Sequence, residues 1–223
     1  MDLVDGNGNN INPFIDPKVR NYGKAGFDRT HNMTINYIYK VPGLSNKLGN
    51  NGVAKQVFDN WEISGITTFL SGSPLGIGYS LVQGTDIIGG SGGGLDSRVV
   101  LIGNPILPKG ERTFNKFFNT GAVRPPTRAE LGIGNAAKDL IRGPGTNNWD
   151  ISLFKTFELT RDGGVRLQYR LETFNTFNHT QFTGVDTSGR FDLNTGAQVN
   201  ALFGSYTSAA NSRRIVMALK LMF

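Results

Sequence analysis

The clearest pattern along the chain is an alternation of apolar and polar side chains. Between residues 164 and 173, apolar and polar residues alternate at every position. Successive side chains of a β-strand point to opposite faces, so a period of two predicts a strand with one apolar and one polar face. The odd-numbered positions are Val165, Leu167, Tyr169, Leu171 and Thr173, and the even-numbered ones are Arg166, Gln168, Arg170 and Glu172.

The same alternation recurs in four other stretches. At the end of the chain the odd-numbered residues Ile215, Met217, Leu219, Leu221 and Phe223 alternate with Arg214, Val216, Ala218, Lys220 and Met222. Strands are therefore expected near residues 31–40, 60–71, 148–159, 164–178 and 213–223. Runs of about 10 residues match the length of a tilted strand that crosses a bilayer, whereas strands of soluble proteins usually have about 5–6 residues.

The connections between these strands also differ in length. Only Thr-Arg-Asp-Gly-Gly separates Leu159 from Val165, and Asp-Gly-Gly supplies the positive φ angles of a tight hairpin. The stretches 72–147 and 179–212 are long and rich in Gly and Asn. Short turns on one side and long loops on the other are typical of outer-membrane barrels. The stretch 43–59 lies on the short-turn side and is longer than usual there.

A soluble sandwich also alternates, so a soluble β-rich carbohydrate-binding or adhesive module remains the alternative interpretation. Strand length and the aromatic residues near strand ends favour the membrane. Lys155 lies on the face predicted to contact lipid, where a charge is costly. Its ammonium is expected either to reach the rim of the sheet or to face inward through a bulge.

Composition narrows the classes of protein further. The chain has 30 glycines and no cysteine, which disfavours a helical fold and excludes disulfides and thiolate metal sites. Its net charge of +6 comes from scattered Lys and Arg, and this pattern predicts no nucleic-acid partner.

Candidate chemistry is sparse, and we expect no enzyme activity and no cofactor. Gly89-Gly-Ser91-Gly-Gly93 matches G-x-S-x-G, but a glycine run supplies the match without the strand and helix that a nucleophile elbow needs. A hydrolase that uses Ser91 is the third hypothesis. The Asp5-Gly-Asn7-Gly-Asn9 stretch resembles a calcium loop but lacks the complete pattern. His31 and His179 have no second ligand at metal-binding spacing, so no metal site is predicted.

Several segments together resemble the C-terminal barrel region of TonB-dependent outer-membrane transporters, of the variety with a carboxypeptidase-regulatory-like domain. They are Phe27-Asp-Arg-Thr-His-Asn32, Asn60–Phe69 with Ser71-Gly-Ser-Pro74, Arg142–Lys155, Glu172–His179 and Leu219-Lys-Leu-Met-Phe223. The last segment resembles a barrel-assembly signal, whose alternate apolar residues here are Ile215, Met217, Leu219, Leu221 and Phe223. Together these segments span most of residues 27–223 in the expected order.

The resemblance implies an all-β fold, an antiparallel up-and-down meander of long strands that forms the C-terminal part of a transmembrane β-barrel. Residues 1–223 would form an open, curved and incomplete part of that barrel, with residues 1–30 and the other long loops extracellular. Its implied location is the Gram-negative outer membrane, with the C-terminus in the periplasm. The implied partners are the lipid bilayer, a plug, the remaining strands of a barrel of roughly 22 strands, the TonB protein and the barrel-assembly machinery.

One row of polar residues is the candidate functional site. The side chains of Asp150, Arg166, Gln168, Arg170 and Glu172 should face the barrel lumen. They would either contact the plug or an anionic substrate, or pair with one another in a wet interior. Substrate identity is expected to depend on the long loops, because binding residues usually lie on loops that a rigid scaffold holds.

Overall fold

The computed structural model describes residues 16, 18, 21–47, 52–84, 98–160 and 162–223. The chain divides into two compact units. One, here the long-strand unit, comprises residues 31–70, 146–181 and 210–223. The other, here the loop unit, comprises residues 1–30, 71–145 and 182–209.

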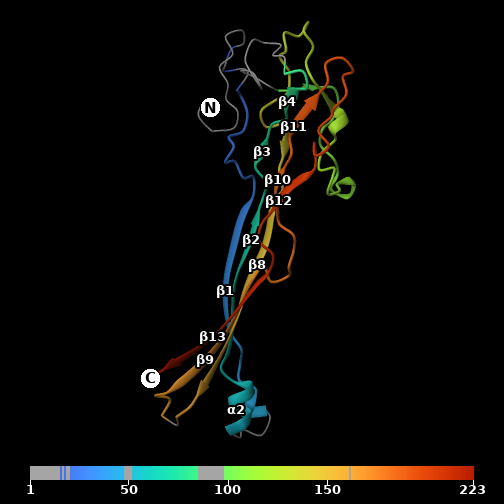
Figure 1. Ribbon diagram of the computed structural model, residues 1–223. Helices are drawn as coiled ribbons and strands as arrows, with labels where there is room; N and C mark the ends of the chain where they lie inside the picture. Colours follow the sequence, from blue (N-terminus) through green and yellow to red (C-terminus); the bar gives the residue numbers. More distant parts are fainter. Residues whose placement is uncertain (1–15, 17, 19–20, 48–51, 85–97, 161) are drawn as a thin grey trace. The chain divides into compact units, whose positions relative to one another are not determined.

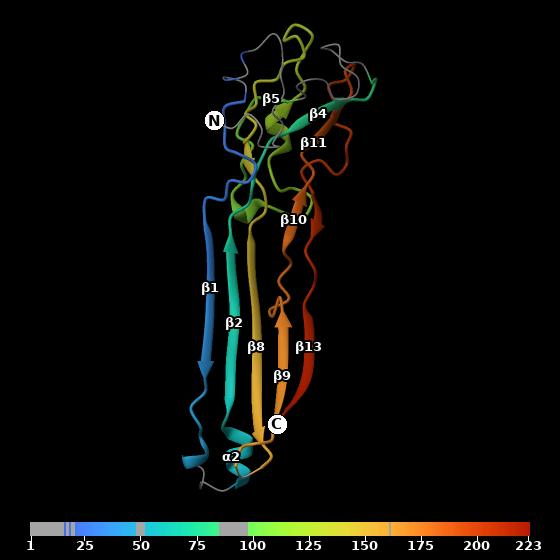
Figure 2. The ribbon, with the colours of Figure 1, turned by 90° about the vertical axis from the view of Figure 1, so that its left-hand side faces the viewer.

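A single antiparallel sheet of five strands makes up most of the long-strand unit, in the order β1-β2-β8-β9-β13 (Figures 1 and 2). Each strand pairs with its predecessor in the sheet, so this is the up-and-down meander that the alternation predicted. The strands are β1 (Asn32–Lys40), β2 (Trp61–Leu70), β8 (Thr146–Glu158), β9 (Arg166–Phe174) and β13 (Arg214–Met222).

The sheet is open. Among the described residues, β1 pairs only with β2 and β13 only with β9, so each outer strand has one unpaired edge. Closed membrane barrels built from one chain use about eight strands or more. Five strands therefore form an incomplete barrel, as expected.

Strand β9 is shorter than the predicted span 164–178. It ends at Phe174, because Asn175 and Asn178 adopt positive φ angles of 51° and 52°. Asparagine tolerates this left-handed conformation better than most residues. The Asn175 side chain is buried and donates to the carbonyl of His179, at 3.0 Å, which closes the turn.

The two kinds of connection differ as predicted. A tight hairpin joins β8 to β9, and the Leu159 amide closes it by donating to the Val165 carbonyl at 2.9 Å. Gly163 supplies a positive φ of 71° there. The connection between β1 and β2 contains η1 (Ser45–Lys47) and the short helix α2 (Gly52–Phe58), which lies at the ends of these strands (Figure 1).

The loop unit is a folded body with its own core. Its elements are β3 (Pro74–Leu75), β4 (Gly78–Leu81), β5 (Val100–Leu101), η2 (Lys109–Glu111), η3 (Thr120–Ala122), β6 (Val123–Arg124), β7 (Ile141–Arg142), β10 (Phe182–Val185), β11 (Ser188–Phe191) and β12 (Tyr206–Ala209). They form four two-stranded pairings, of which β4 with β11 is parallel. In the stretch 98–103, the strand β5 covers only Val100–Leu101.

Apolar side chains from three distant parts of the chain fill this core. Phe118 and Phe203 meet edge to face with ring centroids 5.3 Å apart. Outside the core, Arg142 forms an ion pair with Asp28, and Arg124 forms one with Glu130 at 2.6 Å. The buried core consists of Ile77, Val99, Phe117, Phe118, Val123, Ala136, Ile141, Phe191 and Phe203.

A substitution at Gly134 tests whether the loop unit is packed as tightly as a folded domain. A Cβ at Gly134 would overlap the backbone carbonyl oxygens of Arg98 and Val99, whereas one at Gly110 meets nothing within 4 Å. We expect Gly134→Ala to destabilise this unit by about 1–3 kcal/mol, the usual cost of overpacking. Hydrogen exchange at the Ala136 amide, which donates to the Val99 carbonyl at 3.1 Å, measures the loss. Gly110→Ala is the matched control, and equal protection in both variants would contradict tight packing.

Candidate functional site

The pairing register gives the sheet two chemically different faces. Odd-numbered residues pair with odd-numbered ones at every interface between the five strands, as in Tyr39↔Ile63, Ile63↔Leu153, Leu153↔Leu171 and Leu171↔Met217. No register shift occurs in these four ladders. Because side chains alternate between faces, one unbroken register places all odd-numbered side chains on one face and all even-numbered ones on the other.

The odd-numbered face is apolar and uncovered. Met217 is 67% exposed, and Ile215, Leu219 and Leu221 are also exposed. Among the described residues of the long-strand unit, no second sheet packs over this face. A soluble sandwich would bury such a row against a second layer about 10 Å away, so this face needs an apolar environment outside the unit.

Aromatic side chains mark both ends of the apolar face. At one end the Trp149 ring meets Phe69 and Phe177 edge to face, at 5.8 and 5.7 Å. At the other end lie Trp61 and Phe157, with the Lys155 ammonium over both rings. Trp149 and Phe157 are separated by about 27 Å along the strand, at about 3.4 Å per residue. A tilt of about 40° reduces this to about 20 Å along the membrane normal, near the height of the apolar band of a membrane barrel, about 25 Å.

The even-numbered face is polar and hollowed. A groove of about 710 Å³ lies over β1, β2, β8 and β9. Asp150 and Glu172 contribute the carboxylates of its lining, and Ile38, Ile66 and Phe174 contribute apolar surface. The remaining lining residues are Asn36, Tyr37, Ser64, Gly65 and Ser152.

The predicted lumen residues all lie on this even-numbered face, but they have different roles. The Asp150 carboxylate accepts hydrogen bonds from the Asn175 amide, at 2.8 Å, and from the Asn148 side chain, at 2.9 Å. It therefore holds the turn that ends β9. Gln168 accepts a hydrogen bond from Arg170 Nε at 2.7 Å, and the Arg170 guanidinium also lies 5.4 Å from the Phe154 ring centre.

Mutual charge pairing, one of the two predicted uses of this row, is not what the described residues show. No ion pair joins Asp150, Arg166, Arg170 and Glu172 among them. The register explains why, since Arg170 lies opposite Phe154 and Ala218, and Glu172 lies opposite Ser152 and Val216. The carboxylate of Glu172 lines the groove with no partner among the described residues.

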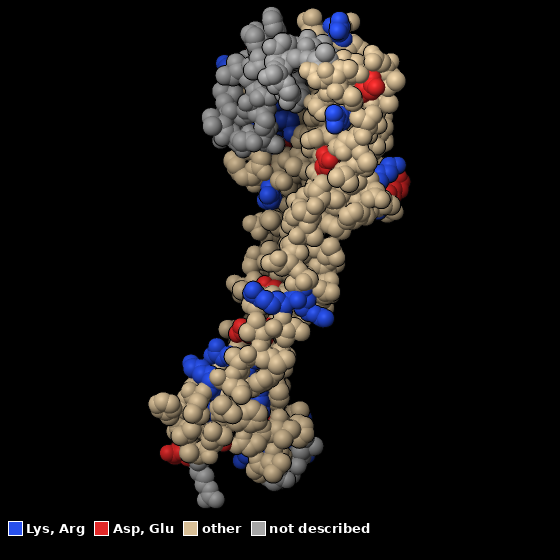
Figure 3. Space-filling view, viewed as in Figure 1, with Lys and Arg blue, Asp and Glu red and all other residues tan. Residues whose placement is uncertain are grey.

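Charge is unevenly distributed over the polar face. Strands β9 and β13 contribute four basic residues and one acidic one to it, Glu172. Basic side chains gather over this part of the sheet in the space-filling view (Figure 3). A surface of one sign attracts solutes of the opposite sign. The four basic residues are Arg166, Arg170, Arg214 and Lys220.

Lys155 is the charged residue on the apolar face, and its ammonium finds partners at the end of the sheet. Its side chain is 2% exposed, and its ammonium donates to the backbone carbonyl of Asp59. The Trp61 and Phe157 rings lie 5.5 and 5.1 Å from the nitrogen. The register is unbroken there, so the prediction that Lys155 reaches the rim is confirmed, and no bulge is needed.

The residue that receives Lys155 belongs to a small polar node. The Asp59 carboxylate accepts hydrogen bonds from the Ser45 hydroxyl, at 2.5 Å, and from the Ser45 amide, at 3.1 Å. These two bonds, the hydroxyl first, lower the pKa of Asp59 below its usual value. The node is therefore stabilised above pH ~4 and loses this contribution as Asp59 becomes protonated at lower pH. Sequence reasoning missed this node, because Asp59 and Lys155 bond to backbone and hydroxyl groups, which leave no pattern of paired charges.

The structure gives no support to the other candidate sites among the residues that it describes. The Ser91 motif and the Asp5–Asn9 stretch lie outside the described residues. His179 Nδ1 lies 2.9 Å from Gln181 Nε2. Within the described part of the chain, no group of three His, Cys, Asp or Glu residues could hold a metal ion. None of the described helices is long and apolar enough to cross a membrane.

Comparison with known protein families finds a match over most of the chain. A family model described as "Outer membrane beta barrel domain" matches residues 2–216. No curated protein and no solved structure matches the chain.

The contact between Lys155 and Asp59 should hold the connection between β1 and β2 against the sheet. We expect Lys155→Met, which keeps the apolar stem and removes the donor, to loosen residues 41–60 and cost about 1–2 kcal/mol. The measurement is hydrogen exchange at the Ser45 amide and the emission maximum of Trp61. Lys220→Met is the matched control on an exposed lysine. Unchanged exchange in Lys155→Met would show that the contact contributes nothing to this connection.

Proposed function

The chain belongs to the family of outer membrane beta barrel domains, and from this premise we propose that it forms part of the wall and outer vestibule of a TonB-dependent outer-membrane transporter. The coarse part of this statement, an outer-membrane location and a β-barrel fold, follows from the family. The transport function, its coupling to TonB and the direction of the chain in the membrane are the proposal.

The main support for the proposal is that the register of the five-stranded sheet keeps odd-numbered residues on one face and even-numbered residues on the other, without a shift. A barrel wall separates hydrocarbon outside from water inside, so it needs one apolar and one polar face across every strand. The long-strand unit has these two faces. Its strands have 9 to 13 residues, close to the length of about 9–11 that crosses a bilayer.

The lengths of the connections support a direction in the membrane. The tight hairpin between β8 and β9 is on the same side as the end of β13, since β9 and β13 are antiparallel neighbours. Short turns of outer-membrane barrels are periplasmic. We therefore assign the hairpin and the C-terminus to the periplasm, and the connections β2–β8 and β9–β13 to the outside.

The folded core of the loop unit supports a role in substrate recognition. A loop with a packed interior holds its surface residues in fixed positions, which a flexible loop cannot do. The polar face of the sheet would meet the plug, and its basic half on β9 and β13 would favour an anionic solute. No catalytic step is assigned to this chain, because uptake would draw its energy from TonB.

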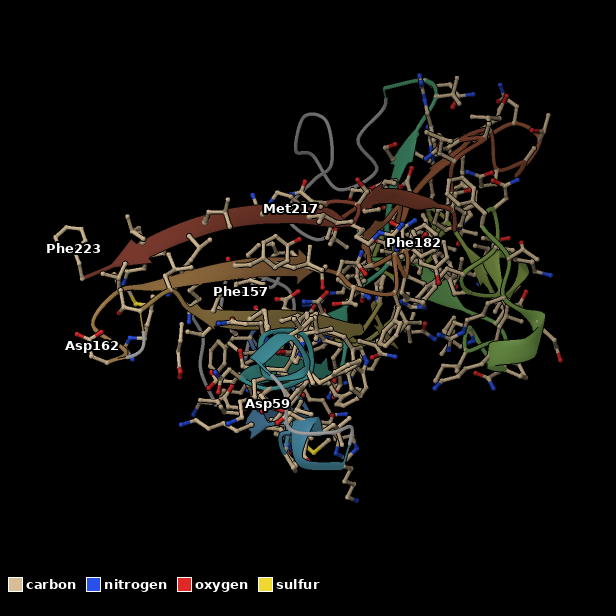
Figure 4. The ribbon with its side chains drawn as sticks, turned by 90° about the horizontal axis from the view of Figure 1, so that it is seen from below. Asp59, Phe157, Asp162, Phe182, Met217 and Phe223 are labelled. Atoms are coloured by element: carbon tan, nitrogen blue, oxygen red, sulfur yellow. The ribbon has the colours of Figure 1, made fainter. Side chains whose placement is uncertain are left out.

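The missing strands and the assembly machinery are further proposed partners. The free edges of β1 and β13 would pair with the remaining strands of the barrel. Phe223 is 98% exposed at the end of β13, and its ring stands clear of the sheet (Figure 4). A free terminal aromatic with Ile215, Met217, Leu219 and Leu221 on its face fits recognition by the barrel-assembly machinery.

Single cysteines test the assignment of the two faces, since the chain has no cysteine of its own. We expect Ala218→Cys, on the polar face, to react with a water-soluble maleimide in intact outer membranes. Leu219→Cys, on the apolar face, should react at least about tenfold more slowly, because thiolate formation is disfavoured in hydrocarbon.

Both variants should label equally after denaturation, which controls for the thiol itself. Equal rates in the membrane, or a faster reaction at Leu219→Cys, would contradict the assignment of the faces. A protein found in the soluble fraction without detergent would instead favour the carbohydrate-binding or adhesive module.

The TonB-dependent part of the proposal has a separate test. We expect the reading frame that contains this chain to encode a plug and a TonB-contacting segment upstream of Met1. The full-length protein should then retain the purified C-terminal domain of TonB in a pull-down, and deletion of that segment should abolish retention. A full-length protein that has no plug and does not retain TonB would contradict coupling to TonB and leave the barrel assignment intact.

A further inference from the structure

The connection between β1 and β2 is longer than a periplasmic turn requires. A tight hairpin such as 159–165 joins neighbouring strands with far fewer residues. The extra residues contain η1 and α2 and are tied to the sheet. Besides the node at Asp59, Gln56 Nε2 donates to the Glu158 carbonyl at 2.7 Å.

Helix α2 turns an apolar surface away from the protein. Ala54 is its buried residue. Val53 is 74% exposed and Val57 is 49% exposed, and residues four apart lie on the same face of a helix. The neighbouring Phe58 and Leu44 are also exposed. Four apolar side chains in one short connection make an exposed patch that needs an explanation.

The patch continues the apolar face of the sheet. Trp61, on the odd-numbered face, donates its indole N–H to the Val57 carbonyl at 2.9 Å. This bond places the last turn of α2 beside the aromatic group at that end of the sheet, which also contains Phe157 and Lys155. Trp and Tyr at such positions lie at the level of the lipid headgroups. In a barrel wall, α2 would therefore lie at the depth of the headgroups.

The charges of the connection complement a phosphate surface. Lys47 and Lys55 are exposed, and neither has an acidic partner among the described residues. Asp59 is the only acidic residue between positions 41 and 60, and its carboxylate is occupied by Ser45. Figure 4 shows Asp59 beside α2, viewed from this end of the sheet.

We infer that α2 and the turn before it form an interfacial anchor, which inserts Val53, Val57 and Phe58 into the periplasmic leaflet and binds anionic phospholipid headgroups through Lys47 and Lys55. This inference rests on the proposed function for the choice of leaflet. An exposed apolar face with flanking lysines is the pattern of helices that lie in a membrane interface, and anionic lipid attracts such lysines.

Depth-dependent quenching in bilayers tests the anchor. Single-cysteine variants Val53→Cys, Met217→Cys and Glu111→Cys of the full-length protein carry a bimane label. Each is purified from the outer membrane and reconstituted in vesicles of phosphatidylethanolamine and phosphatidylglycerol. Lipids brominated near the headgroup should quench the label at position 53, and lipids brominated deep in the acyl chain should quench that at position 217. Neither should quench the label at position 111, in η2 of the loop unit.

Two failures are distinguishable in this design. Quenching at position 217 without quenching at position 53 would overturn the anchor and leave the proposed function in place. An unquenched label at position 217 would contradict the barrel wall itself, and the anchor with it.

A charge variant tests the lipid headgroup separately. In vesicles that contain phosphatidylglycerol, the double variant Lys47→Gln with Lys55→Gln should reduce quenching at position 53. For the protein with both lysines intact, quenching at position 53 should be weaker in vesicles of phosphatidylcholine alone than in vesicles that contain phosphatidylglycerol. Lys116→Gln, on an exposed lysine of the loop unit, is the matched control. Quenching that is independent of lipid charge and of both lysines would overturn the binding of anionic lipid.

Discussion

Hydrocarbon offers no hydrogen-bond partner to a peptide group, so a strand that crosses a bilayer must find all its backbone partners in neighbouring strands. The other features of the long-strand unit depend on this constraint. It explains strands of similar length in strict antiparallel order and a register without shifts through all four ladders. It also explains why the free edges of β1 and β13 need further strands. When every backbone group has a hydrogen-bond partner, only the side chains still contact the surroundings. One face contacts hydrocarbon and the other contacts water, so apolar and polar residues alternate with a period of two.

The ends of the sheet show how residues that fit neither solvent are accommodated. Lys155 lies on the apolar face, but its position next to the last turn of α2 lets the ammonium reach the Asp59 carbonyl and two aromatic rings. The same connection carries the exposed apolar side chains of α2. At the other end Asp150 fastens the turn that begins at Asn175. Both ends are thus held by polar contacts to backbone groups, which remain effective at the membrane boundary where water is present.

The sequence was sufficient to predict the sheet, because apolar and polar residues alternate within each strand and this local pattern defines the two faces. It was insufficient where structure depends on contacts between distant residues. The core of the loop unit joins Ile77, Phe118 and Phe203, which share no local period, and its strands are as short as two residues. The end of β9 was missed because Thr173 and Phe177 continue the alternation, although the asparagines at 175 and 178 are residues that favour a turn. The groove, and the lack of a partner for Glu172 within the described part of the chain, depend on which residues face each other across strands. The sequence alone does not show that register.

Solid-state NMR of the protein in bilayers measures directly which solvent each face of the sheet meets, through magnetisation transferred from lipid or from water. On β13 we expect rapid transfer from acyl chains to Met217 and Leu221, and rapid transfer from water to Ala218 and Lys220. Transfer from water to both sets at the same rate, or from lipid to the even-numbered residues, would contradict this expectation.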